Sequence, residues 1–470
     1  MIQPETALEE RDNGSHAPAP HRVWLPIGIG VATLLFTVRL FHFIDRHAVN
    51  VLFWDQWDFW GGLFEGAGPW TLWRWQHGPH RQGLGGLVVA VTAWLTDWNA
   101  RIEVFVSGAI MLLAALAALA LVRRERGRWV GSDAVLPVLF LSLSQYELFA
   151  LTPNPAHGPL PLLLVMLFAL GLQMRSRWRG LAVLVATNFA ATHTGFGVFL
   201  GAVAPVVFAA RLTAAVRNQS GRLTPAVGLA AALGSLALFF HGYVPNPSAT
   251  CFQFPDPHPV RYVSFLGTLF LRPFEIHGGG AVLTLGLALG LACAGLACWS
   301  CWRMLAPRER THLPEIVFAL TSFSLLFAAN SAVGRACLGP ESAGASRYVP
   351  YLIPFLLAAY LALSTGGSPA WPRTAVLAAL CSLLLGKEAF RMHHNIEDAD
   401  HYANGKRRWR DCYLATSDVA GCSVSFQIYP EPAATHLEEK LRFLRERHLS
   451  FFRQSVRPTD RARASEVPSR

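Results

Sequence analysis

Long apolar stretches separated by short polar segments dominate the pattern along this chain. A stretch of roughly 20 apolar residues can cross the hydrocarbon core of a bilayer as a helix. We therefore predict an all-α polytopic membrane protein with about eleven spans. The predicted spans are Trp24–Phe43, Ile102–Val122, Ala134–Leu151, Pro159–Met174, Gly180–Thr192, Gly197–Ala210, Pro225–Tyr243, Ala281–Trp302, Leu313–Asn330, Tyr348–Ser364 and Trp371–Phe390.

Arginine clusters indicate the direction of these spans, because lysine and arginine are enriched in short cytoplasmic loops. The clusters are Arg123, Arg124, Arg126 and Arg128; Arg175, Arg177 and Arg179; Arg211, Arg217 and Arg222; and Arg303, Arg308 and Arg310. If all are cytoplasmic, an even number of spans separates each from the next. Leu84–Trp98, which is short for a span, is therefore predicted as a juxtamembrane helix on the outer face. The N-terminus is then cytoplasmic and the C-terminus periplasmic, in a bacterial inner membrane.

The polar segments complete the predicted domain organisation. Residues 1–23 are polar, contain prolines and lack a small-residue cleavage site, which predicts a disordered cytoplasmic tail. Residues 24–390 form the transmembrane domain, with a first outer loop over 44–101 and a long outer loop over 244–280. Residues 391–456 are predicted as a small extracytoplasmic appendage with a strand, Val424–Tyr429, and an amphipathic helix, Ala433–Phe452. Residues 457–470 are predicted to be disordered.

Composition agrees with a membrane protein. The 470 residues are 52% hydrophobic and only 15% charged, with a mean hydropathy of +0.33, whereas soluble domains carry about 25% charged residues. The sign of the net charge, +10, matters less than the placement of arginines in short loops, where they set orientation in the bilayer. A nucleic-acid-binding function therefore has little support.

The eight cysteines show no spacing suited to zinc. The predicted topology places Cys251, Cys337, Cys412 and Cys422 outside, where disulfides persist, and the other four within spans. We predict a Cys412–Cys422 disulfide and leave open whether Cys251 pairs with Cys337. Cys298 and Cys301 lie in an apolar run, where small-residue packing is the simpler explanation.

The stretch from Phe53 to Arg81 concentrates acids, histidines and tryptophans just after the first span. Tryptophan prefers the membrane interface because its ring is apolar and its N–H needs a polar partner. A carboxylate at that depth is costly to desolvate and usually has a function. The stretch is therefore either a site that acts on lipid headgroups or an interfacial anchor whose acids lie in solvated turns.

Further unusual polar residues lie at predicted outer ends and loops. Besides Asp55, Asp58, His80 and Arg81 they are Gln145, Glu147, Asn154, His157, Thr192, His193, Thr194, Asp256, His258, Arg261, Arg272, Glu275, His277, Arg335, Glu341, Ser346, Arg347 and Tyr348. Outer arginines run against the charge bias of membrane loops. A lipid phosphate or pyrophosphate would compensate them, because guanidinium donors fork onto phosphate oxygens.

Each of these residues also has a simpler structural explanation. Arg335 and Arg347 could pair with Glu341, and Glu147 could be a buried or hydrogen-bonded acid. His77 and His80 flank Gly78 and Pro79 in a turn rather than on one helical face, which disfavours a metal site.

Several motifs resemble the GT-C superfamily of membrane glycosyltransferases. Asp55-Gln56-Trp57-Asp58 resembles the acidic motif in the first outer loop of that superfamily. The segment from Trp75 to Gly86 resembles a histidine–arginine element of bacterial proteins of this type, and the segment from Gly334 to Pro354 resembles a late arginine and Ser-Arg-Tyr signature. His448–Phe452 also resembles the end of such proteins. The chain departs from the best-studied families in its second acidic position, Glu147.

This resemblance implies transfer of a sugar from a polyprenyl-phosphate donor to a glycan, lipid or protein acceptor at the outer face. The catalytic residues implied are Asp55 as general base, Asp58 and Glu147; the phosphate-binding residues are His80, Arg81, Arg261, Arg335, Arg347 and Tyr348. The long outer loop would close over the acceptor. No cofactor is expected, and a divalent metal is not favoured.

Three other functions are compatible with the sequence. A lipid-linked saccharide flippase or transporter would need polar groups near the bilayer midplane and broken helices. A surface polysaccharide polymerase or ligase would share the architecture. An inactive scaffold would have an empty, narrow first-loop cavity.

Overall fold

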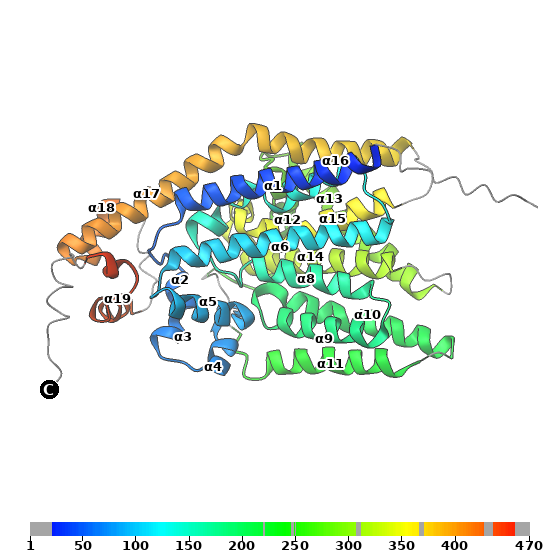
Figure 1. Ribbon diagram of the computed structural model, residues 1–470, viewed down its shortest axis with the longest axis horizontal. Coiled ribbons are helices and arrows are strands. Elements are labelled where there is room, and N and C mark those ends of the chain that lie inside the picture. The colour runs from blue at the N-terminus through cyan, green and yellow to red at the C-terminus, as the bar shows by residue number, and fades with distance from the viewer. Residues whose placement is uncertain are drawn as a thin grey trace, which may run out of the picture.

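Helices account for nearly all of the regular structure in the computed structural model, which describes residues 21–219, 221–245, 249, 251–306, 312–365, 371–426 and 436–455. Most of the long helices run side by side along one axis, with the short helices α2–α5 and the C-terminal helices α18 and α19 gathered at one end (Figure 1). The all-α fold class is therefore confirmed. The predicted tail lies outside the described residues up to residue 20, and α1 begins at His21; residues 456–470 also lie outside them.

The helices and strands follow the apolar pattern closely. The long helices of the bundle are α1 His21–His47, α6 Ala100–Arg126, α8 Pro159–Leu172, α9 Arg177–Thr192, α10 Val198–Arg217, α11 Leu223–Phe240, α12 Val260–Leu271, α13 Ala281–Leu305, α14 Leu313–Arg335, α15 Val349–Ser364 and α16 Trp371–Phe390. The first outer loop contains α2 Gln56–Phe59, α3 Gly61–Phe64, α4 Pro69–Arg74, β1 Gln76–His77, β2 His80–Arg81 and α5 Gly83–Leu95. The C-terminal segment contains α17 Met392–Thr416, α18 Val419–Phe426 and α19 Leu437–Glu446.

Within the described part of the chain, 7 helices are long and apolar enough to cross a membrane. They are α1, α6, α10, α11, α13, α14 and α15, some extended by a short turn. This establishes multi-pass membrane character. The predicted helix in the first outer loop is confirmed as α5, and the predicted turn His193–Phe196 separates α9 from α10.

The third predicted span, Ala134–Leu151, is not a continuous helix. After η1 Gly131–Ala134, α7 covers only Val135–Phe140, and the chain continues through the 3-10 turn η2 Leu143–Gln145 and the π-helical turn η3 Glu147–Leu151. Polar side chains explain the break, because Ser142 accepts a hydrogen bond from the Ser144 backbone N–H (3.0 Å) and Gln145 bonds the Phe140 carbonyl (3.1 Å). Such local bonds compete with the helical ladder.

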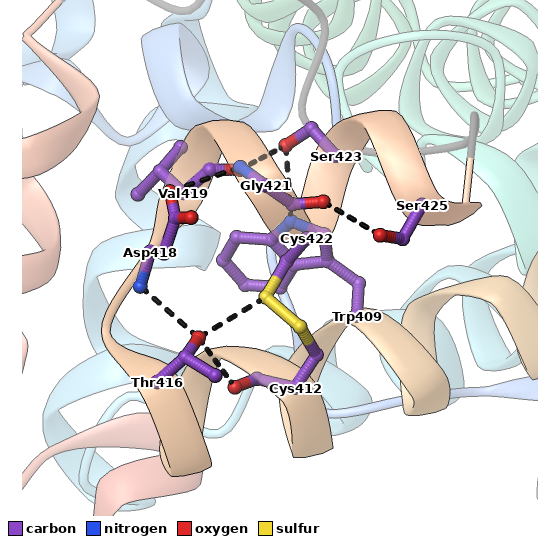
Figure 2. The surroundings of a disulfide bond; sticks show 9 residues. All are labelled: Trp409, Cys412, Thr416, Asp418, Val419, Gly421, Cys422, Ser423 and Ser425. Carbon is purple, nitrogen blue, oxygen red and sulfur yellow. Dashed lines mark hydrogen bonds between the residues drawn. A yellow bond between two sulfur atoms is a disulfide. The ribbon is translucent and has the colours of Figure 1, made fainter.

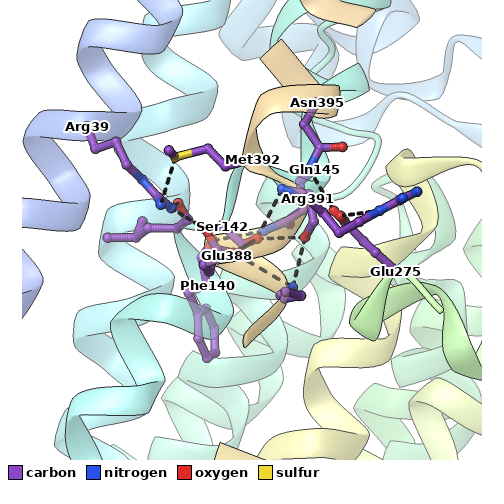
Figure 3. Close-up of polar contacts among 12 residues, drawn as sticks. Arg39, Phe140, Ser142, Gln145, Glu275, Glu388, Arg391, Met392 and Asn395 are labelled. Carbon is purple, nitrogen blue, oxygen red and sulfur yellow. Dashed lines mark hydrogen bonds and ion pairs between the residues drawn. The ribbon is translucent and has the colours of Figure 1, made fainter. Parts of the chain in front are cut away.

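Charged side chains fasten α16 against this broken segment (Figure 3). Glu388 accepts from Arg39 of α1 (2.6 Å) and from the Ser142 hydroxyl. Lys387 donates to the Ser144 hydroxyl (2.9 Å). The ends of α1, α7, η2 and α16 are therefore held together by paired charges rather than by apolar packing alone.

The C-terminal segment packs on the first outer loop. Leu441 and Leu444 of α19 belong to the same buried cluster as Trp57, Trp60 and Trp409. This burial contradicts the interfacial-anchor interpretation for Trp57 and Trp60, which are 0% and 1% exposed. The amphipathic pattern thus correctly predicted a helix near Ala433–Phe452, although α19 is shorter.

Both cysteine pairs of the predicted outer face form disulfides. The predicted Cys412–Cys422 bond joins α17 to α18 (Figure 2), and Cys251 pairs with Cys337. The other four cysteines, in α13 and α16, are free. The strand predicted for Val424–Tyr429 is wrong for residues 424–426, which continue α18; residues 427–429 lie outside the described part of the chain. The local bonds of Ser423 and Ser425 to carbonyls one turn earlier fit a helix.

The helix α12, within the predicted long outer loop, packs against α13 through two glycines. A Cβ atom at Gly286 would lie 1.9 Å from the Gly267 carbonyl oxygen, whereas a Cβ at Gly295 of the same helix would meet nothing within 4 Å. Helix α12 also contacts η7 Pro340–Gly344, which lies within the late arginine loop, the segment from Ser331 to Arg347 that carries Arg335 and Arg347. This close approach therefore supports one wall of the cavity described below.

We expect Gly286→Ala to destabilise the protein by about 1–3 kcal/mol, because the added methyl group separates two helices that pack backbone to backbone. Gly295→Ala in α13 is the matched control and should unfold at the wild-type temperature. Thermal unfolding of both detergent-purified variants measures the difference, and equal transition temperatures would contradict the packing described here.

Candidate functional site

A cavity of about 950 Å³ opens between the first outer loop, the late arginine loop and α19. Six of the residues predicted for the site line it: Asp55, Asp58, His80, Arg335, Arg347 and Tyr348. The acids of the first outer loop and the arginines near residue 340 therefore line one cavity, although nearly three hundred positions separate them. Its size also excludes the narrow first-loop cavity expected of an inactive scaffold.

Helix α2 and a short hairpin position the acidic and histidine residues. Asp55 is the residue before α2, and its side chain is 57% exposed, with a carboxylate oxygen 4.0 Å from His77 Nε2. β1 and β2 pair with His77 opposite His80, and Gly78 supplies the positive φ of +53° that the turn requires. The hairpin thereby points two histidines toward the acid-bearing helix.

Asp58 and α19 form the next part of the wall. The Lys440 ammonium group lies 3.2 Å from Asp58 Oδ1 and 3.1 Å from the Trp57 carbonyl oxygen. The Lys440 side chain is only 11% exposed, because it packs against the first outer loop. Asp58 is therefore neutralised by an ion pair, which leaves Asp55 as the more accessible carboxylate.

The opposite wall is cationic. Arg335, at the end of α14, and Arg347, just before α15, lie 5.4 Å and 5.6 Å from the centre of the Tyr348 ring, and Arg335 also donates to the Tyr348 hydroxyl. Arg347 pairs with Glu147 (3.1 Å). Within the described residues no carboxylate pairs with Arg335, so the alternative in which Arg335 and Arg347 pair with Glu341 is not observed. A guanidinium without an acid partner beside a cavity favours an anionic ligand.

Glu147 supports this wall from behind. Its backbone N–H donates to the Ser346 hydroxyl (3.0 Å), and its carboxylate also accepts from the Arg347 backbone N–H (3.3 Å). It does not line the cavity. The geometry therefore places Glu147 as the partner that orients Arg347 rather than beside Asp55.

Two other predicted residues also lie outside the cavity lining. The Arg81 guanidinium donates to three backbone carbonyls, those of Phe239 (3.0 Å), Arg74 (2.7 Å) and His241 (2.9 Å), so it ties the first loop to the end of α11. Arg261 lies 3.6 Å from Asp256. None of the described residues of the long loop over 244–280 lines the cavity.

His157 is the main residue that the sequence analysis left without a role. Its ring lies 4.1 Å from that of His80, edge to face, and both rings line the cavity. Neither ring nitrogen of His80 has a hydrogen-bond partner among the described residues, nor does Nε2 of His157. Only its position in a predicted outer segment pointed to it, because the pairing joins residues far apart in the chain.

Burial holds both histidines neutral. It lowers the pKa of His80 well below its usual value, and the neighbouring His77 and Arg335 lower it further. Burial likewise lowers the pKa of His157, with His80, His77 and nearby arginines adding to the effect. The two rings can therefore exchange hydrogen bonds with a ligand at neutral pH without adding positive charge. No group of three or more His, Cys, Asp or Glu residues suited to a metal ion occurs in the described residues.

A buried polar seam holds the first loop on the bundle. Glu103 of α6 accepts hydrogen bonds from Gln56 Nε2 (3.3 Å) and Trp60 Nε1 (3.1 Å). Lys406 of α17 donates to the Ala150 and Leu151 carbonyls (2.8 and 2.7 Å). Burial lowers the pKa of Lys406 to about 7, which the nearby Glu103 partly opposes. The seam fixes α2, and with it the position of Asp55.

We expect the stability of the protein to fall as the pH drops below about 6.5, the ordinary pKa of histidine. His80 and His157 have lower pKa values in the folded protein, so the unfolded chain binds more protons below that pH and is favoured there. Thermal unfolding between pH 8 and pH 5 measures the slope.

The double substitution His80→Phe and His157→Phe keeps aromatic packing and should flatten that slope. His393→Gln, which changes a ring that is 87% exposed, is the control and should leave it intact. An unchanged slope in the double variant would contradict the assignment.

Comparison with protein-family models, with curated proteins and with solved structures finds no match. The resemblance to GT-C glycosyltransferases therefore stays a prediction made from the motifs.

Proposed function

We propose that this chain is an integral membrane glycosyltransferase that moves a sugar from a polyprenyl-phosphate donor to an acceptor at the outer face of a bacterial inner membrane. One observation carries the proposal: an accessible carboxylate, Asp55, and a guanidinium without an acid partner, Arg335, line the same cavity at the ends of membrane helices.

The proposed reaction uses these two walls differently. Asp55 takes the proton of the acceptor hydroxyl or amine as that atom attacks the anomeric carbon. The bond between the anomeric carbon and the phosphate oxygen breaks, and its electron pair leaves with the polyprenyl phosphate. Arg335 and Arg347 stabilise the charge that develops on the leaving phosphate. His80 and His157, both neutral, are placed to hydrogen-bond sugar or phosphate oxygens.

The proposed orientation draws support from both ends of the bundle. The cavity and both disulfides lie at the end that holds α2–α5 and α19, and disulfides persist outside the cytoplasm. The arginines after α6, α8, α10 and α13 lie at the opposite ends of those helices. The eleven-span topology with a cytoplasmic N-terminus belongs to this proposal.

A lipid-linked saccharide transporter is the second candidate, favoured by the broken segment η2–η3. Transporters place such breaks beside a polar site at the bilayer midplane. Here the polar residue of the break, Glu147, contacts Arg347 just before α15 begins. The break therefore supports the wall of the outer cavity through Arg347, which favours chemistry at the interface. A polymerase or ligase for surface polysaccharide would use the same cavity and differ in its acceptor.

We expect Asp55→Asn and Arg335→Gln each to reduce glycan transfer by at least about 100-fold, through loss of the general base and of charge stabilisation, respectively. The assay is complementation of a gene deletion, with surface glycans and lipids compared by mass spectrometry.

Two matched substitutions serve as controls for that experiment. Asp45→Asn removes an exposed outer acid that pairs with Arg101, and Arg261→Gln removes an outer arginine that does not line the cavity; both should complement. Full complementation by Asp55→Asn would refute its role as base. Transport of the lipid-linked saccharide without transfer would favour the second candidate.

A further inference from the structure

A second cavity, of about 340 Å³, lies at the other end of the bundle. It is bounded by the ends of six helices: α8, α10 and α13 terminate there, and α9, α11 and α14 begin there. Helix α14 connects the two cavities, because Glu315 lies in the second and Arg335 in the first. At a rise of about 1.5 Å per residue they are roughly 30 Å apart, which is the thickness of a hydrocarbon core.

The lining of this cavity combines basic groups with an apolar wall. Its charged and titratable members are Arg175, Arg177, Arg211, Arg303, His312 and Glu315. The apolar wall includes Leu172, Leu181, Leu184, Phe208, Ala214 and Met304. Water-soluble anions need only the first group, so the apolar wall indicates a ligand that also carries hydrocarbon.

The charges in the cavity do not cancel. Glu315 forms an ion pair with Arg211, whose Nε and Nη2 atoms lie 3.0 and 2.5 Å from the two carboxylate oxygens. Among the described residues, no carboxylate pairs with Arg175, Arg177 or Arg303. The Arg177 side chain lies against the backbone of Gly221, where an added Cβ would be 3.0 Å from Nη1. Arg303 is held over the Trp299 ring at 5.9 Å. Two of the three free guanidinium groups thus have defined positions.

We propose that this cavity binds an anionic phospholipid. Its phosphate is held by Arg175, Arg177 and Arg303, and the part of the acyl chains next to the headgroup lies against the apolar wall. Basic pockets between membrane helices on the cytoplasmic side suit such headgroups. The volume accommodates a headgroup and the adjoining part of the chains, near the lower limit of ligand sites. This site is separate from the proposed transferase cavity and does not depend on its function.

The test titrates detergent-solubilised full-length protein with dimyristoylphosphatidylglycerol and, separately, with dimyristoylphosphatidylcholine. Native mass spectrometry counts bound lipid, and thermal unfolding reports stabilisation. We expect the anionic lipid to bind and stabilise the protein. The triple variant Arg175→Gln, Arg177→Gln and Arg303→Gln should bind it about a hundredfold more weakly.

The matched control is Arg123→Gln, Arg124→Gln and Arg128→Gln, which removes the same charge from the same end of the bundle outside the cavity. It should bind the lipid as the wild type does. If both triple variants lose affinity for the lipid equally, general surface charge explains the binding and the proposal is overturned. Equal binding of the two lipids would also overturn it. So would stabilisation by inorganic phosphate alone at the same concentrations, because the apolar wall would then play no part. The single variant Arg177→Gln, at an exposed position, supplies the measurement if the triple variant does not fold.

Discussion

The seam around Glu103 and Lys406 is the interaction on which the outer half of the molecule depends. An acid and a lysine removed from water are costly, and each must be matched by hydrogen bonds. Glu103 accepts hydrogen bonds from Gln56 of α2 and from Trp60, the residue before α3. Lys406 donates to two carbonyls of the π-helical turn η3. Four segments that are distant in sequence are thereby fixed in one arrangement. Helix α2 has only four residues, so apolar packing alone would not fix its position.

The cationic wall is built by a different principle. Arg347 is oriented by Glu147, which in turn is held by Ser346, so this arginine is fixed before any ligand arrives. Arg335 is held only by Tyr348 among the described residues. One cation is thus compensated within the protein and the other is not. That asymmetry leaves one guanidinium of this wall available to an anionic ligand and limits the cost of placing two arginines together.

Periodicity and charge bias were sufficient to predict most of the helices, because a membrane span must be long, apolar and internally hydrogen-bonded. They failed at Ala134–Leu151, where serine and glutamine side chains compete for backbone groups within an apolar stretch. The sequence also predicted that Asp55, Arg335 and Arg347 would meet, from their shared outer position. It could not place His157 or Lys440 in the cavity, because pairing across distant segments depends on tertiary packing. It could not show that Arg81 donates to three carbonyls, because every residue has a backbone carbonyl and the sequence does not indicate which ones lie nearby.

The Cys251–Cys337 bond joins two cysteines 86 positions apart, and the ring that it closes contains the whole of α12, α13 and α14. Its second cysteine lies two positions after Arg335. The arginine loop is thus covalently tied to the segment that follows α11, and this tie forms only after thiols are oxidised. Formation of this covalent tie beside Arg335 requires an oxidising compartment, which the outer side of the membrane would supply in the orientation proposed above. In the proposed orientation, the chain thereby couples completion of its cationic wall to arrival on the outer side of the membrane.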